Sequence, residues 1–198
     1  MKFFHWPGKS QADAARRPGE ANKAFSANAE NDIADALLEI ARAVSENDAA
    51  VLEAVSRCAF DLQEFFTEQE VFFQETGMSR SRPAQELQWR GLTKILEDHG
   101  YVCERDWKDE KEDFVFFFGG LKGVRSNGLA IDPDWLDETA DIPAWGAILT
   151  EKWREKGFAA AFLDIDSDSY VLFPCPTNAY SHLRELAERL GADVCILQ

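Results

Sequence analysis

The stretch FAAAFLDIDSDSYVLFPC, at residues 158–175, constrains the fold more than any other part of the sequence. A mostly apolar run at 158–165 leads into the polar segment 166–169, and a second apolar run follows at 170–173. This pattern predicts a strand, a tight turn and a second strand. Since side chains alternate along a strand, Phe162 and Leu163 are expected to be buried on opposite faces, with Ser167 exposed at the tip. A strand that is apolar on both faces is central in its sheet and covered on both sides.

Elsewhere in the chain, apolar residues at helical spacing and capping residues predict the helices that cover the two faces of the sheet. One helix is expected to begin near Asp32. A second is expected to begin at Asn47 and to continue towards Gly77 unless it breaks near Thr67. Further helices are expected from Pro83 to Gly100, after residues 109–113, from Pro143 to Gly157, and from Thr177 or Asn178 to Gly191. For residues 114–118 a strand remains an alternative, because Gly119 and Gly120 disfavour a helix. Further strands are expected at 101–107 and 192–197, the last parallel to 170–173 after a right-handed crossover. The fold class is therefore α+β, with about four short strands in a mixed sheet around a central hairpin and five or six helices.

The charge divides the chain into two parts. Residues 1–29 carry a formal charge of +3, which leaves −18 on residues 30–198. The first part has low complexity and no periodic apolar face, so it is predicted to be a flexible basic N-terminal arm. Residues 30–198 are then expected to form a single α+β domain.

The overall acidity of the chain disfavours some classes of binding partner. A net charge of −15 and a pI near 4.6 disfavour nucleic acid and anionic membrane surfaces. The first residues lack the apolar region of a signal peptide, and no run of about 18 apolar residues occurs. The cysteines stand singly with no CxxC spacing, which predicts buried free thiols in a reducing cytoplasm; they are Cys58, Cys103, Cys175 and Cys195.

The candidate site residues lie at the end of the predicted first strand of the hairpin. Asp164, Asp166 and Asp168 would share a face if the extended backbone continued, and clustered carboxylates suit a hard divalent cation. Ser169 and Cys175 stand where a calcium loop requires glycine and glutamate, so the EF-hand pattern does not fit. The alternative is that the aspartates only stabilise a turn by bonding nearby backbone.

The end of the strand at 101–107 supplies two further tentative binding residues. Trp107, between Asp106 and Lys108, could face a ligand, although packing at the sheet margin is the more frequent role of such a tryptophan. Asp106 would join the three aspartates if its strand pairs beside the hairpin. No cofactor is expected, because the sequence contains no GxGxxG, Walker A, GxSxG or HExxH motif.

The segments LDIDSDSYVLF at 163–173 and YVCERDWK at 101–108 resemble a bacterial family known as domain of unknown function 6630. The resemblance covers roughly residues 32–198 and leaves the basic arm outside. It implies a domain boundary, and it implies no activity, cofactor or catalytic residue.

Three functions from different classes follow as hypotheses. The leading one is a non-enzymatic, acidic, cytoplasmic binding protein that engages a protein partner with a basic surface, as an immunity protein does. The second is a divalent-metal-dependent enzyme that uses Asp164, Asp166 and Asp168. The third is a structural or oligomer-forming domain; the oligomeric state and the role of the arm do not follow from the sequence.

Overall fold

The computed structural model describes residues 18–198, and their side chains from residue 31 onward. The chain divides into two units, residues 1–32 and residues 33–198, and the architecture below is that of the second. Residues 1–17 of the expected arm lie outside the described residues. The helix expected from Asp32 begins earlier, because α1 spans Pro18–Val44 and includes residues 18–29 of that arm.

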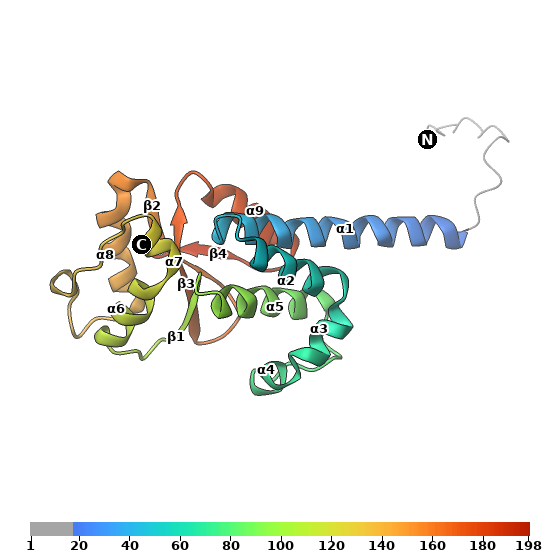
Figure 1. The fold of residues 1–198 in the computed structure, drawn as a ribbon, viewed down its shortest axis with the longest axis horizontal. Helices are drawn as coiled ribbons and strands as arrows, with labels where there is room; N and C mark the ends of the chain where they lie inside the picture. The colour runs from blue at the N-terminus through green and yellow to red at the C-terminus, as the bar shows by residue number, and fades with distance from the viewer. Residues whose placement is uncertain (1–17) are drawn as a thin grey trace, which may run out of the picture. The chain divides into compact units, whose positions relative to one another are not determined.

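The described residues form nine α-helices and four strands, which confirms the α+β class (Figure 1). After α1 the helices are α2 (Ala49–Phe60), α3 (Leu62–Glu68), α4 (Glu70–Glu75), α5 (Ala84–Asp98), α6 (Lys111–Gly120), α7 (Lys122–Ser126), α8 (Ile142–Trp153) and α9 (Tyr180–Arg189). The strands are β1 (Cys103–Asp106), β2 (Phe158–Leu163), β3 (Ser169–Pro176) and β4 (Val194–Ile196). Two single 3₁₀ turns, Pro133–Trp135 and Arg154–Lys156, precede and follow α8.

The predicted hairpin forms the centre of the sheet. The strand order is β1-β3-β2-β4, and β2 pairs with β3 in a register that places Phe162 opposite Leu172. Every pair of neighbours is antiparallel, so the sheet is not mixed as the sequence suggested. The expected parallel relation holds in direction only: β3 and β4 both run opposite to β2, which lies between them.

The sheet is covered on both faces, as the two apolar faces of β2 require. Helices α2, α5 and α9 and the second half of α1 contribute to one core, which includes the fully buried Leu163. Helices α6, α7 and α8 cover the opposite face, where Phe162 packs (Figure 1). Phe162 is only half-buried, because its ring and that of Tyr170 lie near the open end of this layer. Ser167 is exposed, as predicted.

The helix expected from Asn47 towards Gly77 is not continuous: the break considered near Thr67 occurs at Gln69, and a second, unexpected break occurs at Asp61. Asp48, not Asn47, caps α2, and the chain then breaks at Asp61 and Gln69 to give three helices. In an unbroken helix Phe66 and Phe73 would be about 10 Å apart along the axis. The break at Gln69, which lies between them, brings their rings into a stack with 4.4 Å between centroids, and this is the packing gain that accompanies that interruption.

The helix expected after residues 109–113 is confirmed, and the alternative of a strand at 114–118 is wrong. Residues 114–118 are helical, because Phe114 and Phe118 are then one turn apart and both fully buried against α8. The end of the second hairpin strand differs from the expectation. Strand β3 continues beyond Phe173 through Pro174 to Pro176. The ladder of β1 on β3 ends at Leu172, so the missing N–H of Pro174 falls beyond that pairing.

Gly91 of α5 gives a direct test of the packing between α2 and α5. A Cβ on Gly91 would lie 2.5 Å from Cys58 Sγ and 2.9 Å from Phe65 Cε1. We expect Gly91→Ala to lower the free energy of unfolding by about 1–3 kcal/mol through overpacking. The matched control is Gly119→Ala in α6, where the nearest atom is 3.9 Å away and alanine should be neutral or stabilising. Urea unfolding of both variants measures the difference, and equal stabilities would contradict the close approach of α2 to α5.

Candidate functional site

The turn between β2 and β3 is held by its own side chains. Asp164 Oδ1 accepts a hydrogen bond of 2.9 Å from the Asp166 amide, and Ser167 Oγ accepts one of 3.1 Å from the Ser169 amide. Asp166 has a φ of 54°, in the left-handed region that Asp tolerates better than most residues. The turn interpretation therefore fits, with Asp164 and Ser167 as the acceptors rather than Asp166 and Asp168.

The three aspartates do not form a set of metal ligands in this structure. Strand β2 ends at Leu163, so the alternation that would place carboxylates two residues apart on one face stops before the turn. All three are exposed. Within residues 31–198, no group of three or more His, Cys, Asp or Glu side chains is placed to hold a metal ion.

The end of β1 lies against the same turn. Asp106 pairs with Ser169 in the sheet, and its Oδ1 accepts a hydrogen bond of 2.9 Å from the Lys108 amide. The Trp107 amide donates to the Asp168 carbonyl at 3.2 Å. Trp107 is 50% exposed, and Lys108 Nζ lies 4.8 Å from the centroid of its ring. The structure thus brings Trp107 to the predicted aspartates, while the Asp106 carboxylate is engaged in its own turn.

A shallow depression, which we call the hairpin hollow, joins these residues. It has a volume of about 470 Å³ and is lined by Trp107, Phe162, Asp164, Ser167, Asp168, Ser169 and Tyr170. The rings of Phe162 and Tyr170 meet edge to face with centroids 5.1 Å apart. Aromatic faces beside two carboxylates form a surface that attracts cations.

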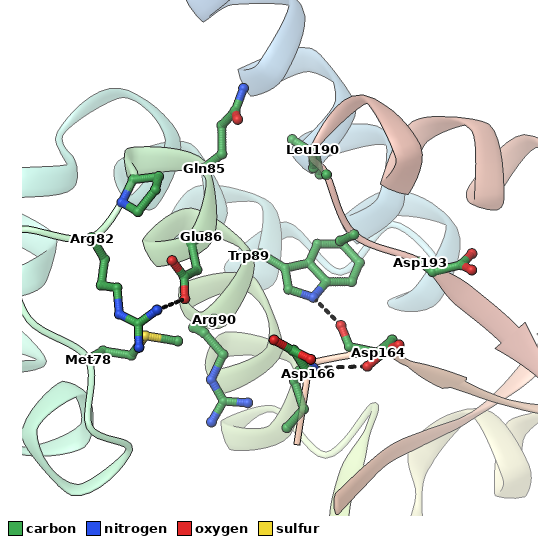
Figure 2. Close-up of a pocket in the computed structure, with 14 residues that line it drawn as sticks. Met78, Arg82, Gln85, Glu86, Trp89, Arg90, Asp164, Asp166, Leu190 and Asp193 are labelled. Carbon is green, nitrogen blue, oxygen red and sulfur yellow. Dashed lines mark hydrogen bonds and ion pairs between the residues drawn. The ribbon is translucent and has the colours of Figure 1, made fainter. Parts of the chain in front are cut away.

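A second depression, which we call the Arg90 cleft, lies on the other side of the turn (Figure 2). It has a volume of about 640 Å³ and is lined by Met78, Arg82, Pro83, Gln85, Glu86, Trp89, Arg90, Asp164, Ile165, Asp166 and Leu190–Asp193. Trp89 of α5 holds the wall in place, because its Nε1 donates to the Asp164 carbonyl at 2.7 Å. Asp164 lines both depressions.

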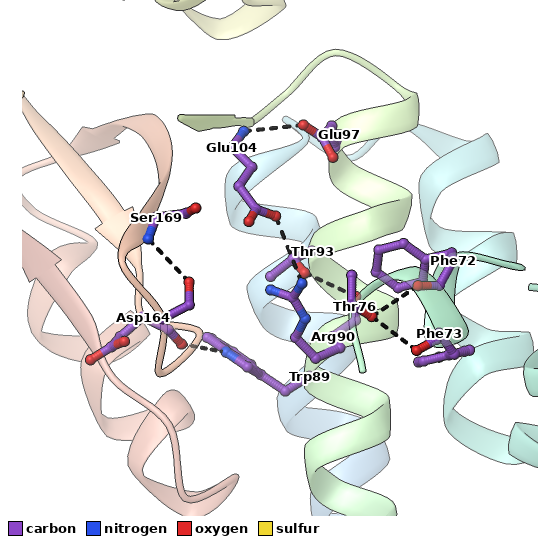
Figure 3. A network of polar contacts seen from close by, with 11 residues as sticks. Phe72, Phe73, Thr76, Trp89, Arg90, Thr93, Glu97, Glu104, Asp164 and Ser169 are labelled. Atoms are coloured by element: carbon purple, nitrogen blue, oxygen red, sulfur yellow. Dashed lines mark hydrogen bonds and ion pairs between the residues drawn. The ribbon is translucent and has the colours of Figure 1, made fainter. Parts of the chain in front are cut away.

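Arg90 is the residue that the sequence did not single out. Its side chain is only 7% exposed, and Nη2 lies 3.8 Å from Glu104 Oε2 (Figure 3). Arg90 is flanked along α5 by the buried Leu87, Trp89 and Leu92. An arginine within so apolar a segment is the sequence signal that could have identified it, because arginine is rarely buried without a partner.

The cysteines are free thiols without a catalytic setting. Cys58, Cys103 and Cys175 are buried and Cys195 is half-buried. Burial raises the pKa of Cys58, Cys103 and Cys175 to about 12, so they stay protonated and unreactive at neutral pH.

Glu97 gives a pH-dependent test of the network beside Arg90. Its Oε1 accepts a hydrogen bond of 3.1 Å from the Glu104 amide (Figure 3). Glu97 is exposed overall, but partial desolvation of its carboxylate and the nearby carboxylates of Glu104 and Asp98 raise its pKa above the ordinary value of 4.5, although that hydrogen bond opposes the shift. The folded state therefore holds the proton more tightly than the unfolded chain, and ionisation of Glu97 lowers stability as the pH rises through and beyond 4.5.

We expect Glu97→Gln, which keeps the oxygen acceptor, to raise the free energy of unfolding at neutral pH. The gain should disappear as the pH falls below 4.5, where Glu97 is protonated in both states. Denaturant unfolding between pH 4 and 7 measures the difference, with Glu185→Gln at an exposed position of α9 as the control for lost charge. A difference that does not vary with pH would contradict this role of burial.

Comparison with known proteins identifies a family and no nearer relative. No curated protein and no solved structure matches the chain. Among the helices of residues 18–198, none combines the length and apolar character needed to cross a membrane. One family model matches residues 36–197, which takes in all four strands and everything from the second half of α1 onward. The chain therefore belongs to the family described as domain of unknown function DUF6630.

Proposed function

We propose that this chain is a non-enzymatic binding protein whose hairpin hollow takes a cationic side chain from a basic protein partner. The observation that supports the proposal is the position of the half-exposed Trp107 beside two carboxylates, Asp164 and Asp168, in one depression. An arginine or lysine side chain placed there would contact an aromatic face and a carboxylate together.

The position of Lys108 supports a cation at this ring. Its ammonium already lies 4.8 Å from the centroid of Trp107. The side chain of Lys108 is part of the same chain and sits at the exposed end of β1, so a partner's cation would compete with it or occupy the remaining carboxylate side of the hollow.

The charge of the whole chain favours the same class of partner. A net charge of −15 speeds the approach of a basic surface and repels acidic ones. The proposal places this encounter in the cytoplasm, because four free cysteines suit a reducing compartment.

The test uses a labelled peptide rich in arginine and lysine, with fluorescence anisotropy as the readout of binding to the full chain. We expect binding at low salt that weakens at moderate salt, and none to the same peptide with glutamines at the basic positions. Trp107→Ala should weaken binding by about 2- to 30-fold, the range of a cation–π contact of about 0.5–2 kcal/mol.

A pair of double variants separates the hollow from the net charge. Asp164→Asn with Asp168→Asn removes two carboxylates from the hollow, and the amide oxygen introduced at position 164 still accepts the turn hydrogen bond. Asp134→Asn with Glu138→Gln removes the same charge from the exposed segment before α8. Only the first pair should reduce binding strongly. Equal reductions in both pairs, or no binding of the basic peptide at low salt, would overturn the proposal.

A further inference from the structure

The Arg90 cleft contains a buried cation whose hydrogen-bonding capacity is largely unused. Arg90 Nε and Nη1 are buried, and neither has a hydrogen-bond partner among residues 31–198. These two nitrogens carry three of the five N–H groups of a guanidinium, which remains charged at any pH a protein survives. The Glu104 carboxylate, at 3.8 Å from Nη2, balances the charge but is beyond hydrogen-bonding distance.

Among the arginines of residues 31–198, Arg105 is the other one that is not exposed, and its contacts differ. Arg105 makes two hydrogen bonds with the Asp109 carboxylate, one of them 2.8 Å long from Nη2. Leaving a buried donor unpaired costs about 1–3 kcal/mol, and more where the donor is charged. The unused donors of Arg90 therefore indicate an oxyanion that is supplied from outside the chain.

The rest of the cleft selects among oxyanions by its own charges. Figure 2 shows Arg82 and Arg90 on the α5 side and Asp164, Asp166 and Asp193 on the side of the sheet. Arg82 is already paired with Glu86 at 3.0 Å. Because carboxylates outnumber free cations around the cleft, a ligand that is only anionic would be repelled by the sheet side.

The carboxylates and the apolar lining point to a zwitterion. Asp166 is exposed on the cleft, and its carboxylate is placed to receive an ammonium group. Between the charged sides lie the apolar surfaces of Trp89, Ile165 and Leu190. A volume of about 640 Å³ is in the range of sites for small molecules.

We propose that the Arg90 cleft binds an α-amino-acid-like zwitterion, with its carboxylate on Arg90, its ammonium on Asp166 and an apolar side chain over Trp89. The carboxylate oxygens take the unused N–H donors of Arg90. Because those donors are covered in the unliganded chain, binding requires a local shift of the cleft wall, and Met78, an unbranched side chain on that wall, is suited to it. The proposed ligand contacts, Arg90, Asp166 and Trp89, do not line the hairpin hollow, although Asp164 lines both depressions, and the assignment does not depend on the function proposed above.

Thermal unfolding of the full chain with free L-amino acids tests the assignment, since a ligand that binds only the native state raises the Tm. We expect one or more apolar amino acids at millimolar concentration to raise the Tm. Acetate, inorganic phosphate and propylamine at the same concentration and ionic strength should not. No shift with any amino acid, or an equal shift with acetate or phosphate alone, would overturn the zwitterion proposal.

Variants locate the effect in the cleft. Arg90→Met should fold, because methionine fills a similar length with apolar atoms and the Glu104 carboxylate left behind is 33% exposed and can be solvated, and it should abolish the ligand-induced shift. Arg90→Lys keeps the charge and loses the planar donor arrangement, so calorimetry should show an affinity at least about tenfold weaker. Asp166→Asn should also weaken binding, whereas Arg125→Met, at an exposed position of α7, should not. A shift that persists unchanged in Arg90→Met or in Arg90→Lys would contradict the proposal.

Discussion

The architecture depends on a hairpin that is apolar on both faces. Ala159, Ala160 and Ala161 of β2 are almost completely buried, so neither face of the sheet can be left to solvent. Their small side chains let helices approach closely. Thr150 of α8 is near enough for its hydroxyl to accept a hydrogen bond of 3.0 Å from the Ala160 amide and to donate one of 2.9 Å to the Leu197 carbonyl. One helix thereby satisfies a backbone group of β2 and one of Leu197, which follows β4, while it covers the face of the sheet.

The polar end of the same hairpin determines where ligands could bind. Two layers of helices cover β2 and β3 up to Leu163 and Val171, and beyond them Ile165 is still buried whereas Asp164 and residues 166–168 are exposed. The end of β1 and the segment before β4 meet the turn through backbone hydrogen bonds: Trp107 donates to Asp168, and Asp164 donates to Asp193. Both depressions therefore lie at the point where the sheet is no longer covered, and Asp164 is shared between them.

The features predictable from sequence were those with a local cause. Gly100, Gly157 and Gly191 have positive φ values and end the elements that the sequence assigned to them. The break at Asp61 had no such local signal, and the break at Gln69, considered near Thr67, accompanies the stacking of Phe66 on Phe73. Likewise the position of Trp107 beside the aspartates depended on β1 pairing with β3, which an alternating pattern alone does not specify. The sequence shows an arginine at position 90 but not that its donors lack partners, because that depends on three segments that come together only in the folded chain.

The burial of Arg90 is a consequence of its place on α5. Its two neighbours in sequence fix α5 from different sides. Trp89 donates a hydrogen bond to the Asp164 carbonyl across the cleft. Gly91, which has no side chain, lets Cys58 of α2 and Phe65 of α3 pack closely against α5. With α5 fixed on both sides, the guanidinium of Arg90 is directed between them, where Glu104 of β1 is its nearest carboxylate. Within residues 31–198, the charged and aromatic contacts of the guanidinium are with the Glu104 carboxylate at 3.8 Å and the Phe72 ring at 5.8 Å from its centroid, and neither contact uses its Nε or Nη1 donors. Under the proposal that the cleft binds a zwitterion, the charge of Arg90 serves the ligand carboxylate, and the placement of α5 would hold the guanidinium in position for it.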